Sequence, residues 1–140
     1  MHKLNSTLLT AGLVTLKDRK LLLAYSNNKK AWYLPGGKVD HGEDSVQSLR
    51  REVLEELLVD LDNERLRYYC HITAPAYGEN PSVIMEQDCF IYDLREEIQP
   101  SNEIGAVRYF SRTEYELEQI RVIGVLMVFD QLETDGLIIR

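Results

Sequence analysis

The sequence contains little that would indicate a secreted protein, a membrane protein or a protein stabilised by a structural metal site. Only two of its 140 residues are cysteines, and neither has a Cys-x-x-Cys or histidine partner at the spacing of a metal site. We therefore expect Cys70 and Cys89 to be reduced, buried thiols in a cytoplasmic protein. No apolar run is long enough to span a membrane. Residues 1–10 are interrupted by polar side chains and do not form a good signal peptide.

Basic residues are also in short supply. The chain carries 16 Lys and Arg against 23 Asp and Glu, so its net charge is −7. This charge argues against extended nucleic acid as a partner, because its phosphates need a basic surface. A small phosphorylated ligand remains compatible with this charge if a cation bridges phosphate oxygens and protein carboxylates.

The length and hydropathy pattern predict one domain over residues 1–140, with alternating strands and helices. Strands are expected at residues 7–17, 21–26, 65–76, 83–94 and 107–110, with a short apolar piece at 32–34. Helices are expected from Asp44 or Ser45 to about Leu58, after a Ser111–Glu114 capping box, and over residues 119–133. Pro35, Gly36 and Gly37 should end any regular structure. This order predicts an α/β (α+β) fold, a mixed sheet covered by helices.

The first predicted helix carries an unusual concentration of carboxylates. Its apolar stripe consists of Val46, Leu49, Val53 and Leu57. Glu52, Glu55 and Glu56 share an arc of about 100° beside that stripe and should repel one another. A bound hard cation with oxygen ligands would relieve the repulsion. Arg51 precedes Glu55 by four residues and could orient the Glu55 carboxylate without binding the metal itself.

The loop before this helix is suited to close contact with a ligand. Leu34, Pro35, Gly36 and Gly37 allow the backbone to turn sharply and to approach a bound group. A backbone carbonyl of the loop could add one ligand to Mg²⁺, which is usually held by few carboxylates together with waters and phosphate oxygens. Such a metal would polarise a phosphorus–oxygen bond and lower the pKa of a bound water.

Residues 37–59 resemble the Nudix box, with the pattern Gly-x5-Glu-x7-Arg-Glu-U-x-Glu-Glu-x-Gly-U, where U is a bulky aliphatic residue. The matching residues are Gly37, Glu43, Arg51, Glu52, Val53, Glu55, Glu56 and Val59. One position departs, because Leu58 stands where the family has glycine. That glycine normally lets the chain leave the helix at positive φ. With leucine, either the helix exit differs or Leu58 adopts a costly conformation.

The resemblance implies a Nudix-type α/β/α sandwich with a mixed β-sheet, and hydrolysis of a nucleoside diphosphate linked to another moiety. It implies Mg²⁺ (or Mn²⁺) as the cofactor. Glu52 and Glu56 would be the principal metal ligands, Glu55 a further or water-mediated ligand, and the Gly36 carbonyl would join them. Glu43 and Arg51 would brace the loop–helix–loop.

Family members often add a carboxylate from a later loop as a ligand or general base. Glu103, just before the strand at 107–110, is the best candidate by this resemblance. Glu96 and Glu97 are rivals, although they are more easily explained as a solvated charge run. Trp32 and Tyr33 could line a base-binding cleft, but simple packing is at least as well supported.

The sequence leaves the substrate open among modified nucleoside triphosphates, ADP-ribose and nucleotide sugars. Pro75 lies where ADP-ribose-cleaving members carry proline, and Tyr77 lies where dinucleoside-polyphosphate-cleaving members carry tyrosine, so these two signals cancel. A Nudix-fold sensor that binds a nucleotide without cleaving it is the alternative function. A third alternative is an interaction protein whose acidic helix face is merely structural. Both a monomer and a homodimer are compatible with the apolar final helix.

Overall fold

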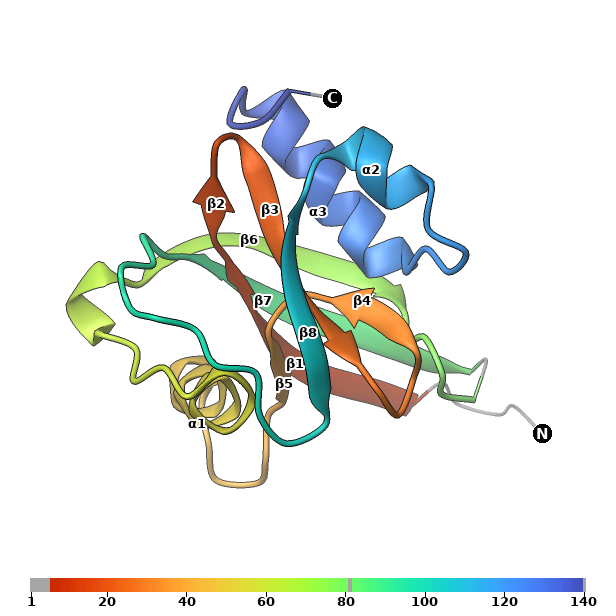
Figure 1. Ribbon diagram of the computed structural model, residues 1–140. Coiled ribbons are helices and arrows are strands. Elements are labelled where there is room, and N and C mark those ends of the chain that lie inside the picture. Colours follow the sequence, from red (N-terminus) through yellow and green to blue (C-terminus); the bar gives the residue numbers. More distant parts are fainter. Residues whose placement is uncertain (1–5, 81, 140) are drawn as a thin grey trace.

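Two β-sheets form the centre of the computed structural model, which describes residues 6–80 and 82–139. The first sheet, in spatial order, consists of β5 (Gly36–Lys38), β1 (Ser6–Val14), β7 (Val83–Ile91) and β6 (Arg67–Pro75). The second consists of β2 (Leu16–Lys17), β3 (Lys20–Ser26) and β4 (Ala31–Tyr33), with β8 (Ile104–Phe110) paired to β3. Figure 1 shows β3 and β8 side by side in front of the longer strands of the first sheet.

The first sheet is mixed, as the sequence predicts. Strands β1 and β7 run parallel over nine residue pairs, whereas β5 and β6 are antiparallel to their neighbours. A parallel pair needs a long crossover connection, and here the connection between β1 and β7 contains the first helix. The second sheet is antiparallel throughout.

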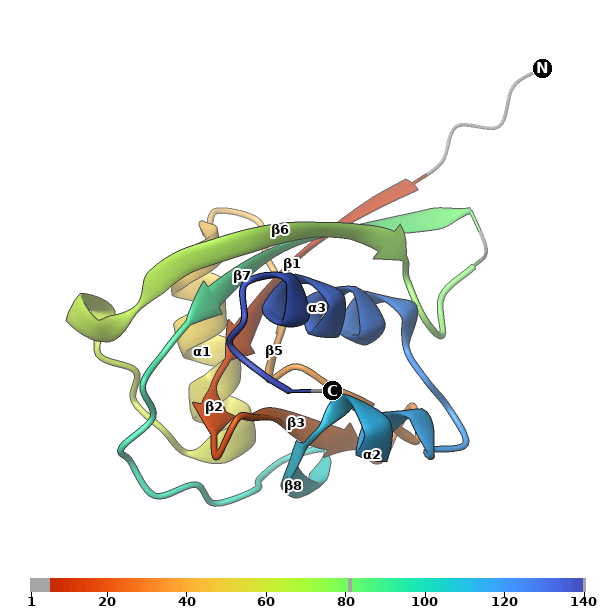
Figure 2. The same cartoon turned by 90° about the horizontal axis from the view of Figure 1, so that it is seen from above.

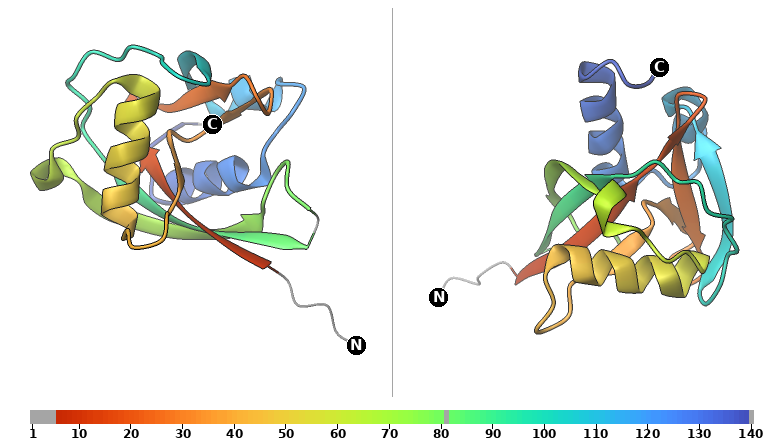
Figure 3. Two further views of the ribbon diagram at one scale, coloured as in Figure 1. Left: turned by 90° about the horizontal axis from the view of Figure 1, so that it is seen from below. Right: turned by 90° about the vertical axis from the view of Figure 1, so that its left-hand side faces the viewer.

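Helices cover both faces of the first sheet. They are α1 (Ser45–Leu57), α2 (Arg112–Glu116) and α3 (Ile123–Thr134), with a 3₁₀ turn, η1, at Asn63–Arg65. Strand β1 divides its side chains between two cores with a period of two. Ala11 and Leu13 join the core beneath α1, while Val14 joins the core beneath α3. Figures 2 and 3 show α1 and α3 on opposite sides of this sheet, which confirms the α/β/α arrangement.

Several element boundaries differ from the sequence-based expectation: β7 ends at Ile91 instead of residue 94, and β8 begins at Ile104 instead of residue 107. Three further differences have a local reason. The strand expected over residues 7–17 is broken at Thr15, whose hydroxyl donates to the Tyr92 carbonyl where the chain passes between the sheets. Gly36 does not end regular structure but pairs with β1. This close pairing is possible because glycine has no Cβ, which would lie 2.1 Å from the Ala11 carbonyl oxygen. The final helix begins at residue 123 instead of 119, because the Val122 N–H donates to the Tyr115 hydroxyl (2.9 Å) and Val122 is held extended.

Helix α1 begins and ends with two different solutions to the same problem of unpaired backbone groups. At its start, Asp44 and Gln47 form a reciprocal capping box. At its end, Leu58 adopts the left-handed conformation (φ 54°, ψ 38°) and its N–H donates to the Leu54 carbonyl. Leu58 therefore takes the conformation for which glycine is best suited. No helix within the described ranges has the length and apolarity needed to cross a membrane.

Candidate active site

The carboxyl group of Glu56 is the most deeply buried acid on α1. The residue is only 7% exposed, and its Oε1 accepts a hydrogen bond from the Gly36 N–H at 3.1 Å. Burial raises the pKa of Glu56 to about 8, and the charges of Glu52, Glu103 and Glu55 add to the rise, while the Gly36 hydrogen bond opposes it. A carboxylate in this position is costly unless a positive charge joins it.

Glu52 lies one helical turn before Glu56, under the glycine-containing strand β5. A Cβ at Gly37 would lie 2.6 Å from the Glu52 carboxyl carbon, so any other residue would force this carboxylate to shift. Burial raises the pKa of Glu52, whereas its hydrogen bond with Arg51 lowers it. Gly37 thus brings backbone and carboxylate together without steric conflict.

Arg51 holds the loop before α1 against the helix. Its Nε and Nη2 donate to the two carboxylate oxygens of Glu43 (2.8 and 3.1 Å), a bidentate pair. Its Nη1 donates to Glu52 Oε1 (2.9 Å) and Nη2 donates to the Lys38 carbonyl. The i,i+4 contact with Glu55 is longer, at 3.5 Å. Arg51 therefore orients Glu52 more directly than it orients Glu55.

The backbone of Gly36 is also turned toward the acidic side chains. The Pro35 carbonyl accepts a hydrogen bond from the Leu13 N–H of β1 (2.8 Å). Successive residues of a strand direct their backbone groups to opposite sides, so the N–H and C=O of Gly36 point away from β1. The N–H reaches Glu56, and the same alternation directs the carbonyl away from β1, where it can serve as a metal ligand.

A cavity of about 420 Å³ unites several of these groups. Its acidic end is lined by Gly36, Gly37, Asp40, Glu52, Glu56 and Glu103. Glu103 comes from the loop before β8, and its Oε2 accepts a hydrogen bond from the Asn28 side chain (2.5 Å). The sequence-based candidates Glu52, Glu56, Gly36 and Glu103 are thus brought together, although they come from three separate segments.

Glu55 is not among the residues that line the cavity, and its side chain is 46% exposed. Within residues 6–80 and 82–139, no three acidic, histidine or cysteine side chains already stand together as a metal-binding group. The donors nevertheless fit a hard divalent cation, because Glu52, Glu56 and the Gly36 carbonyl all offer oxygen atoms. The buried Glu56 carboxyl is the observation in favour of that fit.

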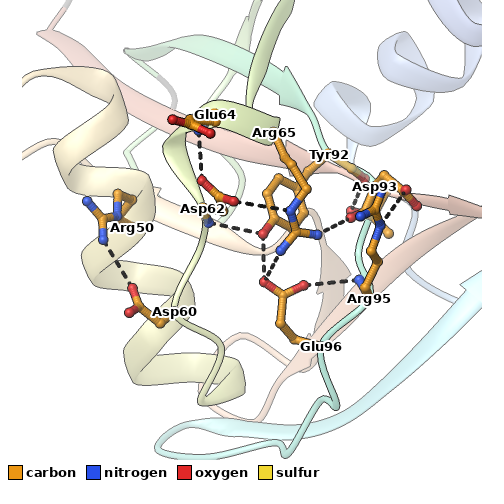
Figure 4. Close-up of polar contacts among 10 residues, drawn as sticks. Arg50, Asp60, Asp62, Glu64, Arg65, Tyr92, Asp93, Arg95 and Glu96 are labelled. Atoms are coloured by element: carbon orange, nitrogen blue, oxygen red, sulfur yellow. Dashed lines mark hydrogen bonds and ion pairs between the residues drawn. The ribbon is translucent and has the colours of Figure 1, made fainter.

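The rival acid Glu96 lies elsewhere (Figure 4). Its carboxylate accepts hydrogen bonds from the Tyr92 hydroxyl (2.6 Å), Arg65 Nη2 (2.7 Å) and the Arg95 N–H (3.0 Å). Glu96 is therefore part of an ordered network instead of a solvated charge run, while Glu97 is exposed. Neither residue lines the cavity of Glu56.

Some cavity residues had no signal in the sequence. Thr10, Gln87 and Asn28 line the cavity, but they come from strands and loops whose pairing the sequence does not specify. Of the two adjacent aromatic residues, only Tyr33 lines the cavity. Trp32 instead packs edge-on against Phe110, with ring centroids 5.0 Å apart.

The fold is similar to solved structures of two MutT proteins and of a bifunctional enzyme with an ADP-ribose pyrophosphatase part. The MutT protein from Methanosarcina mazei Go1 is 16% identical with a TM-score of 0.74, covering 94% of this chain and 96% of its own. The MutT NUDIX hydrolase from Burkholderia pseudomallei is 20% identical with a TM-score of 0.73, covering 91% and 98%. A bifunctional NMN adenylyltransferase/ADP-ribose pyrophosphatase from Francisella tularensis, complexed with AMP and a manganese ion, is 18% identical with a TM-score of 0.70, covering 95% and 43%. At these identities the likeness establishes the fold.

The family follows from the sequence itself. The model of the NUDIX domain matches residues 7–126, and the chain therefore belongs to the Nudix family. The search of curated proteins found no match to its sequence. The expectation drawn from residues 37–59 is confirmed at the level of the class, a Nudix pyrophosphohydrolase that hydrolyses diphosphate linkages.

Proposed function

We propose that this chain hydrolyses a diphosphate linkage in a nucleoside diphosphate derivative and requires Mg²⁺ or Mn²⁺ to do so. The observation that carries the proposal is the meeting of Glu52, Glu56 and Glu103 in one cavity that Gly36 also lines. The manganese ion in the Francisella tularensis structure supports the choice of metal.

The proposed metal ligands are Glu52, Glu56 and the Gly36 carbonyl, with Glu55 as a further or water-mediated ligand. When bound, the cation would supply charge for the phosphate oxygens and lower the pKa of a bound water. Arg51 would hold Glu52 in place through its contact with that carboxylate and its bidentate pair with Glu43. Gly36 would fix Glu56 by its hydrogen bond.

Glu103 is proposed as the general base. It would take a proton from the attacking water, whose oxygen forms a new bond to phosphorus while the bridging phosphorus–oxygen bond breaks. The Asn28 side chain donates to Glu103 and would keep its carboxylate turned into the cavity.

A phosphate-release assay with a panel of nucleoside triphosphates, ADP-ribose, dinucleoside polyphosphates and nucleotide sugars tests the proposal. We expect turnover with Mg²⁺ or Mn²⁺ and none after chelation. Glu56→Gln should reduce kcat by at least about 100-fold, given that even residues behind metal ligands cost 10- to 100-fold. Glu103→Gln should reduce kcat by about 10²- to 10⁴-fold, the usual contribution of a general base. Glu97→Gln, an exposed acid outside the cavity, is the control and should retain wild-type activity.

The same panel separates the enzyme from the sensor. Nucleotide binding without turnover by wild-type protein in either metal would overturn the proposal and leave a Nudix-fold sensor. Turnover that persists in Glu103→Gln with an unchanged pH profile would show that another group serves as the base.

A further inference from the structure

The two cysteines of the chain face each other across neighbouring strands. Cys70 of β6 pairs with Cys89 of β7 in the antiparallel register, and Figure 2 shows these two strands side by side. Cys89 belongs to the core beneath α3, and Cys70 packs against the same core, so both side chains lie on one face of the sheet. Both are free thiols. Two thiols from distant parts of the sequence are thus brought together by the fold.

A β-bulge produces this pairing. Tyr68 lies opposite Phe90, and a regular ladder would next place Tyr69 opposite Cys89. The register instead shifts by one residue between Tyr68 and Cys70, so that cysteine meets cysteine. A bulge re-aims the side chains that follow it and is treated as a designed feature of a sheet.

The pairing satisfies the geometric requirement of a disulfide. The Cα atoms of bridged cysteines are usually about 4.4–6.8 Å apart. Residues directly opposite each other in an antiparallel pair have Cα atoms about 4.5–5.5 Å apart, and their side chains share one face. Cys70 and Cys89 can therefore be joined without moving either strand.

The two thiols differ in their access to solvent. Cys89 is fully buried, with 0% of its surface exposed, because β7 is an inner strand of the sheet. Cys70 is only partly buried, because β6 lies at the edge. The sequence-based expectation of two buried thiols is thus confirmed for Cys89 and wrong for Cys70. A reagent in solution reaches this pair through Cys70.

The electrostatics of the pair favour the same order of reaction. A hydrogen bond from the Cys89 thiol lowers the pKa of Cys70, and the neighbouring His71 adds to this effect, while burial and Asp135 oppose it. The same hydrogen bond, together with burial, raises the pKa of Cys89. The thiolate is the nucleophilic form of cysteine. Cys70 is therefore the attacking thiol and Cys89 the thiol that resolves the intermediate.

We propose that Cys70 and Cys89 are a modification site at which a low-molecular-weight disulfide, such as oxidised glutathione, forms a reversible Cys70–Cys89 disulfide. The Cys70 thiolate attacks one sulfur of the oxidant, which forms a mixed disulfide and releases one glutathione. The Cys89 sulfur then attacks Cys70 Sγ, which breaks the mixed disulfide and releases the second glutathione. The two thiol protons end on the two released glutathione molecules, so the protein is oxidised by two electrons and the oxidant is reduced by two.

Mass spectrometry of the folded wild-type protein after incubation with oxidised glutathione tests the proposal. We expect the mass to fall by two hydrogen atoms, no thiol to react with a maleimide after denaturation, and both thiols to return with dithiothreitol. The alternative is that two small apolar side chains merely pack in the core, where buried cysteines are inert. Two thiols that stay reduced in the folded protein, but are oxidised once urea unfolds it, would establish that alternative and overturn the proposal.

Two variants test the order of attack. Cys89→Ala should stop at the mixed disulfide and gain the mass of one glutathionyl group, because no resolving thiol remains. Cys70→Ser should stay unmodified, because the remaining thiol of Cys89 is fully buried. Glutathionylation of folded Cys70→Ser, or its absence in Cys89→Ala, would contradict the assigned roles. Thermal melting of both variants verifies that they are folded, and the wild-type experiment remains decisive if either is not.

Peptide mapping locates the bond. Trypsin leaves both cysteines in one peptide, residues 68–95, because no Lys or Arg lies between them. Cleavage after glutamate separates residues 65–79 from residues 87–96, so these two peptides should stay joined until they are reduced. A disulfide-linked dimer in place of an oxidised monomer would overturn the intramolecular bond. These measurements involve no turnover, and they therefore stand or fall independently of the proposed hydrolase activity.

Discussion

The N–H of Gly36 donates a hydrogen bond to Oε1 of Glu56 across 3.1 Å, and this contact ties strand β5 to helix α1. Gly36 can occupy this place because it has φ of 135° and no Cβ to meet the Ala11 carbonyl. The bond is a partial compensation for burying Glu56, since a backbone N–H carries only a partial positive charge. A full positive charge at the same point would complete it.

The first prediction concerns the stability of metal-free protein. Burial raises the pKa of Glu56 to about 8, whereas its pKa in the unfolded chain is near 4.3. Between these values the folded state binds more protons, so stability falls as pH rises through this window. Glu56→Gln should abolish that fall and be the more stable protein at pH 8. Melting temperatures in chelator from pH 5 to 9 measure the effect, and parallel curves for the two proteins would contradict it.

Adding Mg²⁺ should reverse the order of the two proteins. A metal bound only by the native state raises the melting temperature, by an amount that depends on the ratio of its concentration to Kd. We expect this rise in wild-type protein and a much smaller one in Glu56→Gln. An equal rise in both would remove Glu56 from the metal site.

Arg51 provides the second prediction. Lysine cannot reproduce its bidentate pair with Glu43 and its simultaneous contact with Glu52. Arg51→Lys should therefore lower metal affinity or kcat by about 10- to 100-fold. The neighbouring Arg50 makes one exposed ion pair with Asp60 (3.1 Å), and Arg50→Lys should be nearly neutral. The activity of both variants, measured as a function of metal concentration, shows whether the bidentate contact of the Arg51 guanidinium is required.

The third prediction uses the departure of this chain from its family pattern. Leu58 sits at φ 54°, a conformation that costs a residue with a Cβ about 1–2 kcal/mol. Leu58→Gly should raise the free energy of unfolding by up to about 1 kcal/mol, because glycine's extra freedom in the unfolded chain offsets part of the gain. The control is Leu54→Gly, also at an exposed leucine of α1, which should lose about 1 kcal/mol. Denaturant titrations that show both variants destabilised alike would contradict this account.

Local sequence signals predicted helix α1 and the placement of its glutamates well. The spacing of the glutamates placed Glu52 and Glu56 one turn apart, and the structure puts both against the same cavity. The Ser111–Glu114 capping box is also present as predicted. Such features depend on residues three or four positions apart, which a helix brings together whatever the rest of the chain does.

Features that depend on contacts between residues far apart in the sequence could not be predicted in the same way. The neighbourhood of Thr10 and Gln87 requires the parallel register of β1 and β7, and nothing at either position marks it. The later start of α3 depends on the Tyr115 hydroxyl, which accepts from Val122 only once α2 has packed. The cavity wall formed by Thr10 and Gln87 could therefore not be predicted from the sequence, whereas the acidic residues of α1 could.

The fourth prediction concerns acid unfolding and the network of Glu96. Burial alone would raise the pKa of Glu96, but hydrogen bonds from Tyr92, Arg65 and the backbone outweigh it and lower the pKa to about 2. The charged form is thus stabilised in the folded state. This stabilisation is complete above the unfolded pKa near 4.3 and is lost as pH falls toward 2.

Glu96→Gln should consequently weaken the pH dependence of stability between about pH 4.3 and 2, and it should be less stable than wild type at pH 7. Glu97→Gln, at the exposed neighbouring acid, should follow the wild-type curve. Unfolding midpoints in urea at a series of pH values measure the slopes. Since Glu96 lies outside the cavity of Glu56, kcat at pH 7 should be unchanged in both variants. A large loss of kcat in Glu96→Gln with an unaltered acid transition would return Glu96 to the list of candidate bases and remove Glu103 from it.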